Sequence, residues 1–223
     1  MVFFFPKTIE TRTSQVNGQI KVVKLFGTYR LVAGGYTQSG GLIHTIWKKV
    51  LKRIAKDLKI KEPKILLLGL GAGSAAQLSH NLWPDAQITA LELDPVMIEL
   101  GKKYFNLDNI SNVRIINNDA IDWVIKKSTK QSRERFRLIL VDLYVGGDPA
   151  PAMNQDAFLS AISRLLEEKG IALFNRLIKS GEKREMKNFK KKLSELFDNV
   201  ERIPSPANAV FAVKKQQKIR PEE

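Results

Sequence analysis

The feature that most constrains the fold is an alternation of short apolar runs with amphipathic helical segments, which begins at Lys64. The first run, KILLLGL, is apolar along its whole length after Lys64, as is typical of a parallel strand buried on both faces. It leads into the glycine-rich turn GLGAGS and then into a helical segment that continues to about residue 82. Four further units repeat the pattern, with strands expected at 88–94, 113–119, 136–144 and 171–177 and helices at 96–105, 120–127, 155–170 and 186–197. The alternation predicts an α/β fold with a Rossmann-like, doubly wound sheet.

The end of the chain predicts a change of strand direction. Two β-rich runs, 200–205 and 209–215, are joined by a short link that contains Pro206. This link is too short for a helical crossover, so the two strands are expected to pair antiparallel.

The residues before the sheet predict a small N-terminal β-hairpin unit. Residues 20–37 contain two β-rich pieces separated by Gly27 and closed by glycines, and residues 42–58 place apolar side chains on one helical face. We therefore expect an N-terminal hairpin extension over 1–41, a Rossmann-like ligand-binding domain over 42–215 and a frayed tail over 216–223.

Composition removes several classes of chemistry. The 223-residue chain is long enough for one such domain, and it contains no cysteine, which excludes disulfides, thiolate metal sites and cysteine nucleophiles. His44 and His80 have no partners at ligand spacing, so no metal site is expected. The opening MVFFFPK has too short an apolar run for a signal peptide or a membrane span, which need about 7–15 and about 20 residues. We therefore expect a cytoplasmic protein without a membrane partner.

The formal net charge of +14 leaves two interpretations open. A basic surface can bind an acidic partner such as nucleic acid, or it can be a solvated exterior. In either case a strongly positive protein is a poor host for a polycationic substrate.

Polar residues at the ends of the expected strands are candidates for ligand binding. Gly69 and Gly71 allow the backbone to turn tightly and approach a ligand at a helix N-terminus. Glu92 ends the second strand 23 residues after Gly69, where a carboxylate accepts hydrogen bonds from both hydroxyls of a ribose. Asp119 ends the third strand, where it could accept from an adenine amino group or cap the helix that starts at Ala120.

Asp142 is the strongest catalytic candidate. It follows six mostly apolar residues at the carboxyl end of the fourth strand, where a carboxylate needs a partner and where open α/β sheets bind ligands. Tyr144 is either a hydrogen-bonding partner for the nucleophile or a packed aromatic. Asn175 ends the fifth strand and points to the ligand edge or caps the following loop. The loop 146–153 is rich in turn formers and could close over an acceptor, whereas Trp47, Trp83 and Trp123 are interpreted as core or interface.

The motifs GLGAGS, LELDP, NDA and VDLY, in that order and with those separations, resemble the S-adenosylmethionine-dependent methyltransferase superfamily and, within it, the spermidine synthase family. Leu67 before the glycines, the β-rich N-terminal unit and GGYTQS with Gln38 favour this subgroup, and the resemblance covers roughly residues 18–213. It implies that S-adenosylmethionine or its decarboxylated form is the cofactor, and that a homodimer forms. It further implies that the adenosyl group contacts a set of six residues: Gln38, Gly69, Gly71, Glu92, Asp119 and Ala120. Asp142 then faces the transferred group.

The chain departs from the spermidine synthase pattern at the acids that surround the amines. That family has an aspartate in the glycine loop, a second aspartate after the strand-end aspartate, and further acidic residues and a tyrosine after the glutamine. The corresponding positions here are Ala72, Val145, Ile43, His44, Trp47 and Lys49. Cationic amines are stabilised out of water by carboxylates within about 4–6 Å, and of these acids only Asp142 is present.

The sequence therefore predicts a methyltransferase of the spermidine synthase-like type, with a small-molecule acceptor that is neither putrescine nor spermidine. The alternatives are a polyamine aminopropyltransferase that uses decarboxylated S-adenosylmethionine, and a non-catalytic nucleic-acid-binding protein.

Overall fold

A computed structural model of the chain describes residues 5–58, 60–129, 131–145, 147–178, 183–205 and 207–215. The expected tail, 216–223, lies outside the described residues, as does Gly146 in the loop expected to cover the acceptor. Among the described residues no helix is both long enough and apolar enough to cross a membrane.

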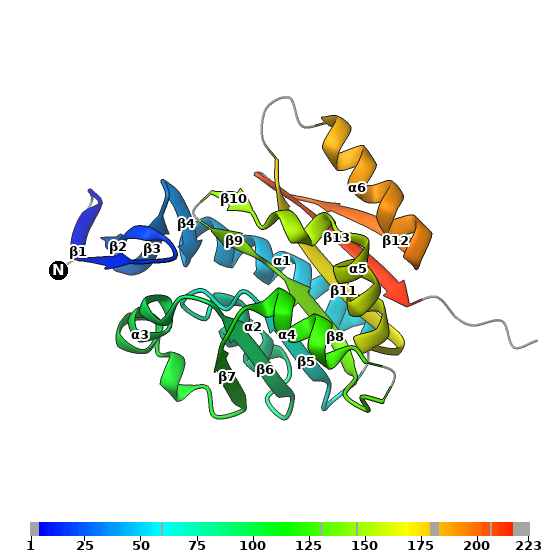
Figure 1. Ribbon diagram of the computed structural model, residues 1–223. Coiled ribbons are helices and arrows are strands. Elements are labelled where there is room, and N and C mark those ends of the chain that lie inside the picture. The colour runs from blue at the N-terminus through cyan, green and yellow to red at the C-terminus, as the bar shows by residue number, and fades with distance from the viewer. Residues whose placement is uncertain are drawn as a thin grey trace, which may run out of the picture.

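A seven-stranded sheet forms the centre of the molecule, in the order β12-β13-β11-β8-β5-β6-β7 (Figure 1). Its strands are β5 (Lys64–Leu68), β6 (Gln87–Glu92), β7 (Val113–Asn117), β8 (Phe136–Val141), β11 (Leu166–Leu177), β12 (Phe197–Pro204) and β13 (Asn208–Lys215). Adjacent strands run parallel except at β13, which is antiparallel to both β11 and β12. The doubly wound sheet and its final antiparallel pair are thereby confirmed.

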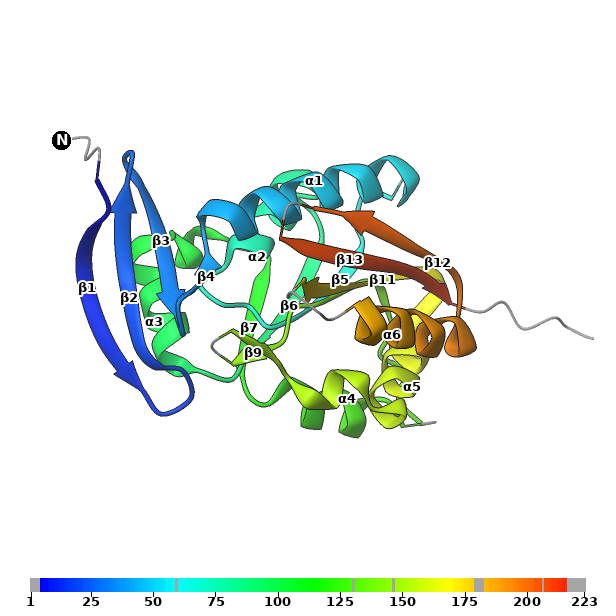
Figure 2. The same cartoon turned by 90° about the horizontal axis from the view of Figure 1, so that it is seen from above.

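Helices cover both faces of this sheet, as Figure 2 shows. The helices α1 (Gly41–Leu58) and α2 (Ser74–Leu82) lie on one face, with α3 (Pro95–Tyr104) beside them, and α4 (Ala120–Lys127), α5 (Asp156–Leu165) and α6 (Lys183–Leu196) cover the other. The apolar run of β5 divides between the two cores: Ile65 and Leu67 pack on the α1 side, Leu66 and Leu68 on the α5 side. Burial on both faces explains why this strand shows no polar alternation.

The N-terminal unit is larger than the expected hairpin. It is a four-stranded antiparallel sheet of β1 (Lys7–Ser14), β2 (Gly18–Leu25), β3 (Thr28–Ala33) and β4 (Tyr36–Ser39). Strand β1 gives little sequence signal because it is polar, and Ser14 is its one buried residue. Apolar side chains of β2 and β3 pack against Ala72 and against Met97 and Leu100 of α3, so this sheet shares a core with the edge of the main domain.

The expected helix over 155–170 is wrong in its second half. Helix α5 ends at Leu165, and β11 begins at Leu166, which pairs with Phe136 of β8 before the register shifts. Sheet pairing and burial of Leu166 therefore override the helical propensity of the following EEK segment. The loop 147–153 contains β10 (Asp148–Pro149), which pairs with β9 (Tyr144–Val145), and the start of a 3-10 helix, η2 (Pro151–Asn154).

Candidate functional site

A cavity of about 360 Å³ lies where the carboxyl ends of the parallel strands meet the N-terminal sheet. Its walls come from β4, the first turns of α1, the glycine loop, the ends of β6, β8 and β11, and the turn before β13. All eight residues predicted for the site line this one cavity: Gln38, Gly69, Gly71, Glu92, Asp119, Ala120, Asp142 and Tyr144. The sequence motifs thus converge in space, although this placement alone does not assign their roles.

The glycine loop needs glycine for both conformation and space. Gly69 has φ +89°, and a Cβ there would lie 2.1 Å from the carbonyl oxygen of Asp142. Gly71 has φ +56°, and a Cβ there would lie 2.9 Å from Ser39 Oγ. L side chains are disfavoured at positive φ, so both positions keep the loop close to its neighbours and open to the cavity.

Two serine hydroxyls form hydrogen bonds that connect the turn between β4 and α1 to the glycine loop. Ser39 Oγ accepts from the backbone N–H of Ala72 at 2.8 Å, and Ser74 Oγ accepts from the N–H of Gly40 at 2.9 Å. The neighbouring Gln38 lines the cavity, and its Nε2 lies 3.4 Å from the carbonyl oxygen of Ala33. Neither serine was predicted from the sequence, because their hydrogen-bond partners are backbone groups about 34 residues away.

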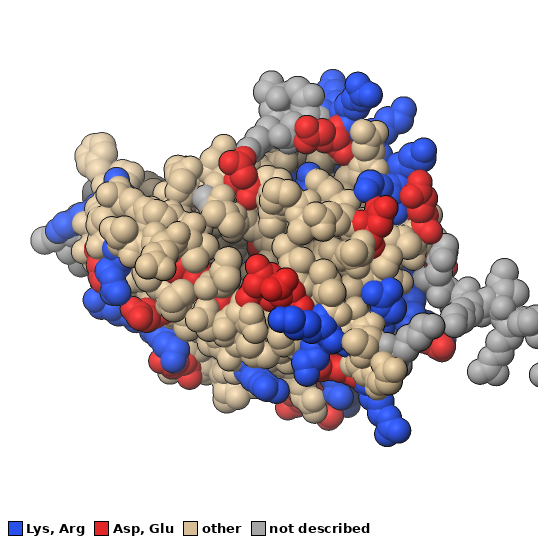
Figure 3. All heavy atoms as spheres, in the orientation of Figure 1, with Lys and Arg blue, Asp and Glu red and all other residues tan. Residues whose placement is uncertain are grey.

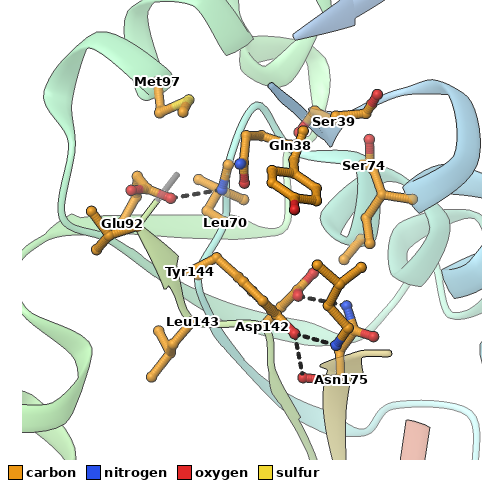
Figure 4. A pocket seen from close by; sticks show the side chains of 18 of the residues that line it. Gln38, Ser39, Leu70, Ser74, Glu92, Met97, Asp142, Leu143, Tyr144 and Asn175 are labelled. Carbon is orange, nitrogen blue, oxygen red and sulfur yellow. Dashed lines mark hydrogen bonds between the residues drawn. The ribbon is translucent and has the colours of Figure 1, made fainter. Parts of the chain in front are cut away.

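Glu92 is held by backbone amides on both sides. Its Oε2 accepts from Gly71 N at 2.7 Å and its Oε1 accepts from Asp94 N at 3.0 Å, as Figure 4 shows for the glycine-loop contact. Burial disfavours the charged form and raises the pKa of Glu92 to about 7, while the two amides oppose this shift. The carboxylate is therefore positioned to accept hydroxyl donors, and such donors would favour its ionised form.

Asp94 connects the N-terminal sheet to the site. Its Oδ1 accepts from Val96 N at 2.9 Å and so caps α3, and its Oδ2 accepts from Ser14 Oγ at 2.5 Å and Asn17 Nδ2 at 2.7 Å. Asn17 also lines the cavity. This buried connection was not expected from the sequence, since its partners lie about 80 residues apart.

Asp119 has the capping role that the sequence left open, and it also lines the cavity; its contact with an adenine amino group stays a prediction. It caps α4, with Oδ1 accepting from Ile121 N at 2.7 Å and from Asp122 N at 3.0 Å. Both capping bonds go to the same oxygen, and within the described part of the chain Oδ2 accepts none. The half-buried side chain lines the cavity, so capping and ligand binding are compatible.

Asp142 lies at the end of a chain of side-chain hydrogen bonds. Its Oδ2 accepts from the indole N–H of Trp47 at 2.8 Å. Its Oδ1 accepts from Asn175 Nδ2 at 2.7 Å, and both of these residues are labelled in Figure 4. Asn175 Oδ1 in turn accepts from Asn208 Nδ2 at 2.9 Å. Burial raises the pKa of Asp142 above its ordinary value, and the two donors oppose the shift. Trp47 is buried as expected, but it also orients this carboxylate.

Tyr144 is bound to the backbone of β11. Its hydroxyl donates to the carbonyl of Asn175 at 3.2 Å and accepts from Leu177 N at 2.6 Å. The hydroxyl is thereby engaged as donor and acceptor, so this geometry favours a role in shaping the wall; the predicted contact with a nucleophile stays a prediction.

The charged side chains in the described lining of the cavity are all acidic. Across the described lining there are three carboxylates, of Glu92, Asp119 and Asp142, and no Lys, Arg or His. Lys49, expected from the resemblance to be near the acceptor, lies outside the lining, and its Nζ donates to the carbonyl of Pro204 at 3.2 Å. Nowhere in the described chain do three or more His, Cys, Asp or Glu residues group as metal ligands.

The sheet order, the glycine loop and the acids at the strand ends define the class I S-adenosylmethionine-type fold. Solved structures agree: a probable spermidine synthase from Corynebacterium glutamicum superposes with a TM-score of 0.76 at 18% identity, covering 95% of this chain and 80% of that chain. Human methyltransferase-like protein 13, in complex with SAH, superposes with a TM-score of 0.65 at 20% identity, covering 81% and 85%.

The family follows from the sequence comparison. Residues 44–210 match the spermine/spermidine synthase domain, and the chain belongs to that family. A polyamine aminopropyltransferase from Chromobacterium violaceum is 30% identical over 155 residues, which cover 68% of this chain and 56% of that protein. The eEF1A lysine and N-terminal methyltransferase of Bos taurus is 26% identical over 126 residues, covering 53% and 18%. The chain therefore matches only 56% and 18% of the lengths of these two relatives.

Proposed function

We propose that this chain is an S-adenosylmethionine-dependent methyltransferase, built on the spermidine synthase-like fold, whose acceptor binds beside Asp142. The related proteins include both methyltransferases and aminopropyltransferases, so they support a transferase and leave the transferred group open. The choice between the two groups rests on the cavity itself.

The residues present fit an adenosyl ligand. Glu92 offers a carboxylate to ribose hydroxyls, Asp119 keeps one carboxylate oxygen for an amino group, and the glycine loop leaves room for close approach. When bound, S-adenosylmethionine supplies an electrophilic methyl group on a sulfonium. The protein's own contribution is to position the acceptor and the cofactor and to hold the acceptor's proton.

The observation that carries the proposal is the single carboxylate at the acceptor end. An aminopropyl donor and putrescine together bring several ammonium groups, each of which needs a nearby carboxylate once it leaves water. In the described cavity wall two of the three acids belong to the adenosyl end, which leaves Asp142 alone at the other. Ala72 is fully buried under the N-terminal sheet, and Val145 is an exposed part of the rim.

The start of α2 favours an intact cofactor over a decarboxylated one. This helix begins after Gly73 with no side-chain cap, and Ser74 and Ala75 at its start line the cavity. Uncapped amides at a helix N-terminus stabilise anions such as a carboxylate. An acidic residue at position 72 would repel that carboxylate, and alanine does not.

Asp142 is the proposed base. Two donors fix its orientation, and its raised pKa makes it a better proton acceptor than an exposed aspartate. We assign Trp47 and Asn175 as positioning residues that act through Asp142.

The test is calorimetric titration of the purified protein with S-adenosylmethionine and, separately, with its decarboxylated form. Binding of the intact form at least tenfold more tightly is expected. Preference for the decarboxylated form would establish the aminopropyl alternative and contradict the proposal.

Surface charge gives less support to the nucleic-acid alternative. On the face drawn in Figure 3, Lys and Arg gather at the α6 end and along the lower edge, with Asp and Glu among them. A groove that follows a nucleic-acid backbone would be lined by basic groups, whereas the described cavity wall contains none.

A further inference from the structure

We infer that the acceptor is an apolar molecule with a single amine, a monoamine with a hydrocarbon or aromatic body, and that its nitrogen binds at Asp142. This inference rests on the proposed function and names the substrate class of the same site. It is carried by the rim of the cavity and by the pattern of charge within it.

The mouth of the cavity is rimmed by exposed apolar side chains. Tyr36 is 43% exposed, Leu42 is 44% exposed and Val145 is 47% exposed, and all three line the cavity. They come from β4, the first turn of α1 and β9, and Tyr36 packs so closely on Gly147 that a Cβ there would lie 2.0 Å from the ring. Leu42 belongs to the first turn of α1, and together with Ile43 and Ile46 it lines the cavity.

The wall behind this rim is also apolar. Ile43 and Ile46 of α1, together with Leu177 and Ala207, line the cavity near Asp142 and its partners. Apolar surface contributes roughly 25 cal/mol per Å² when it leaves water. A ligand that covers both rim and wall must therefore present an apolar body.

The charge pattern selects the polar group of that ligand. An anionic acceptor would meet three carboxylates and, in the described wall, no cation, so it would be repelled. A diamine would place its second ammonium against the isoleucines and the apolar rim, where the described lining of the cavity offers no further carboxylate. A single amine satisfies Asp142 and leaves the remainder of the molecule to the apolar surface.

The chemistry balances with the residues present. Asp142 accepts a proton from the bound ammonium, which frees the nitrogen lone pair. The nitrogen then forms a bond to the methyl carbon as the sulfur–carbon bond breaks, and its electron pair goes to sulfur, which becomes a neutral thioether. The product is an N-methylammonium, and Asp142 returns its proton to solvent.

The experiment measures amine binding to protein saturated with S-adenosylhomocysteine, with n-butylamine, n-hexylamine, putrescine and butyrate as probes. Affinity should rise about fourfold for each added methylene that is buried, and n-butylamine should bind at least tenfold more tightly than putrescine. Butyrate should not bind. Equal or tighter binding of putrescine, or no dependence on chain length, would overturn the inference.

A pair of matched variants tests the same inference by changing the protein instead of the probe. Val145→Asp adds a second carboxylate to the rim and should raise putrescine affinity about tenfold while lowering that of n-hexylamine. Val145→Asn introduces a side chain of the same size as aspartate but without its charge. It should lower the affinity for n-hexylamine without raising the affinity for putrescine. If both variants gained putrescine affinity, or if neither did, the absence of a second carboxylate would not be the reason that the wild-type cavity binds putrescine poorly. Either result would contradict the inference.

The two levels of proposal fail separately. If neither S-adenosylmethionine nor S-adenosylhomocysteine binds, the proposed function fails. If S-adenosylhomocysteine binds and the monoamines do not, only the assignment of the acceptor fails.

Discussion

The two ends of the cavity are built around similar acids in different ways. Glu92 is the last residue of β6 and Asp142 directly follows β8, and burial raises the pKa of each. Glu92 receives its hydrogen bonds from backbone amides 2 and 21 residues away, whereas Asp142 receives its bonds from side chains 33 and 95 residues away. The proposed adenosyl end is thus held by backbone groups close in sequence, and the proposed acceptor end is held by side chains that only tertiary packing brings together.

This difference shows which half of the site can change independently. Backbone donors remain when side chains are replaced, so the two amides that hold Glu92 do not depend on the identity of a neighbouring side chain. Side-chain donors such as Trp47 and Asn175 change with the sequence, so the acceptor end can be rebuilt for another substrate. Substitutions at the two ends should therefore have separable effects on transfer and on cofactor binding.

Asp142→Asn should abolish most of the transfer and leave the adenosyl end intact. Removal of a positioned base lowers a rate by about 10²–10⁴-fold, whereas the affinity for S-adenosylhomocysteine should change less than threefold. Single-turnover rates and calorimetry on the same preparation separate the two effects. A parallel loss of affinity would show that the two ends are not independent.

Glu92→Gln should weaken cofactor binding and leave the rate of transfer nearly unchanged. It removes hydrogen bonds from ribose hydroxyls to a charged acceptor, each about 1.5–3 kcal/mol, so affinity for S-adenosylmethionine should fall about 10- to 100-fold. The single-turnover rate at saturating cofactor should change much less.

The stability of Glu92→Gln distinguishes lost binding from lost folding. Because burial raises the pKa of Glu92 to about 7, its contribution to stability is lost as pH rises through 7. The ligand-free variant should therefore match or exceed the wild type in free energy of unfolding at pH 8. Lower stability at that pH would mean that the carboxylate is needed to hold the loop.

The same contrast explains which features of the fold and the site can be predicted from the sequence alone. Most of the strands and helices of the main sheet, and the convergence of Glu92 and Asp119 on one cavity, could be predicted because burial on two faces, glycine turns and strand-end acids leave local patterns. The Trp47–Asp142 bond leaves none, since a tryptophan on an apolar helical face looks the same whether or not its N–H has a partner. Strand β1 was missed for a related reason: its polar residues carry no period, and its one buried side chain, Ser14, is recognisable only beside Asp94.

Cofactor binding should weaken as the pH falls from 8 to 6. In the ligand-free protein the pKa of Glu92 is raised to about 7, and hydroxyl donors would lower it in the complex. Binding below pH 7 must therefore release a proton, and affinity should fall about fivefold to tenfold over this range. Calorimetry in two buffers of different ionisation enthalpy measures the proton released. Glu92→Gln is the control, and an unchanged pH dependence in that variant would assign the effect to another group.

Ser39→Ala should give the smallest effect, at the junction between the two ends. The substitution leaves the buried N–H of Ala72 without its acceptor, which costs about 1–2 kcal/mol. For a chain of this size the melting temperature should fall by roughly 2–4 °C for each kcal/mol. Because β4 carries both Gln38 and Tyr36, loosening the turn between β4 and α1 should weaken S-adenosylmethionine and the monoamine probes alike, by severalfold each. Ser194→Ala on the exposed surface of α6, where the hydroxyl bonds only its own helix, is the matched control and should change neither. If Ser39→Ala lowered the affinity for one ligand and left the affinity for the other unchanged, the contact between β4 and the glycine loop would support only the binding site of that one ligand.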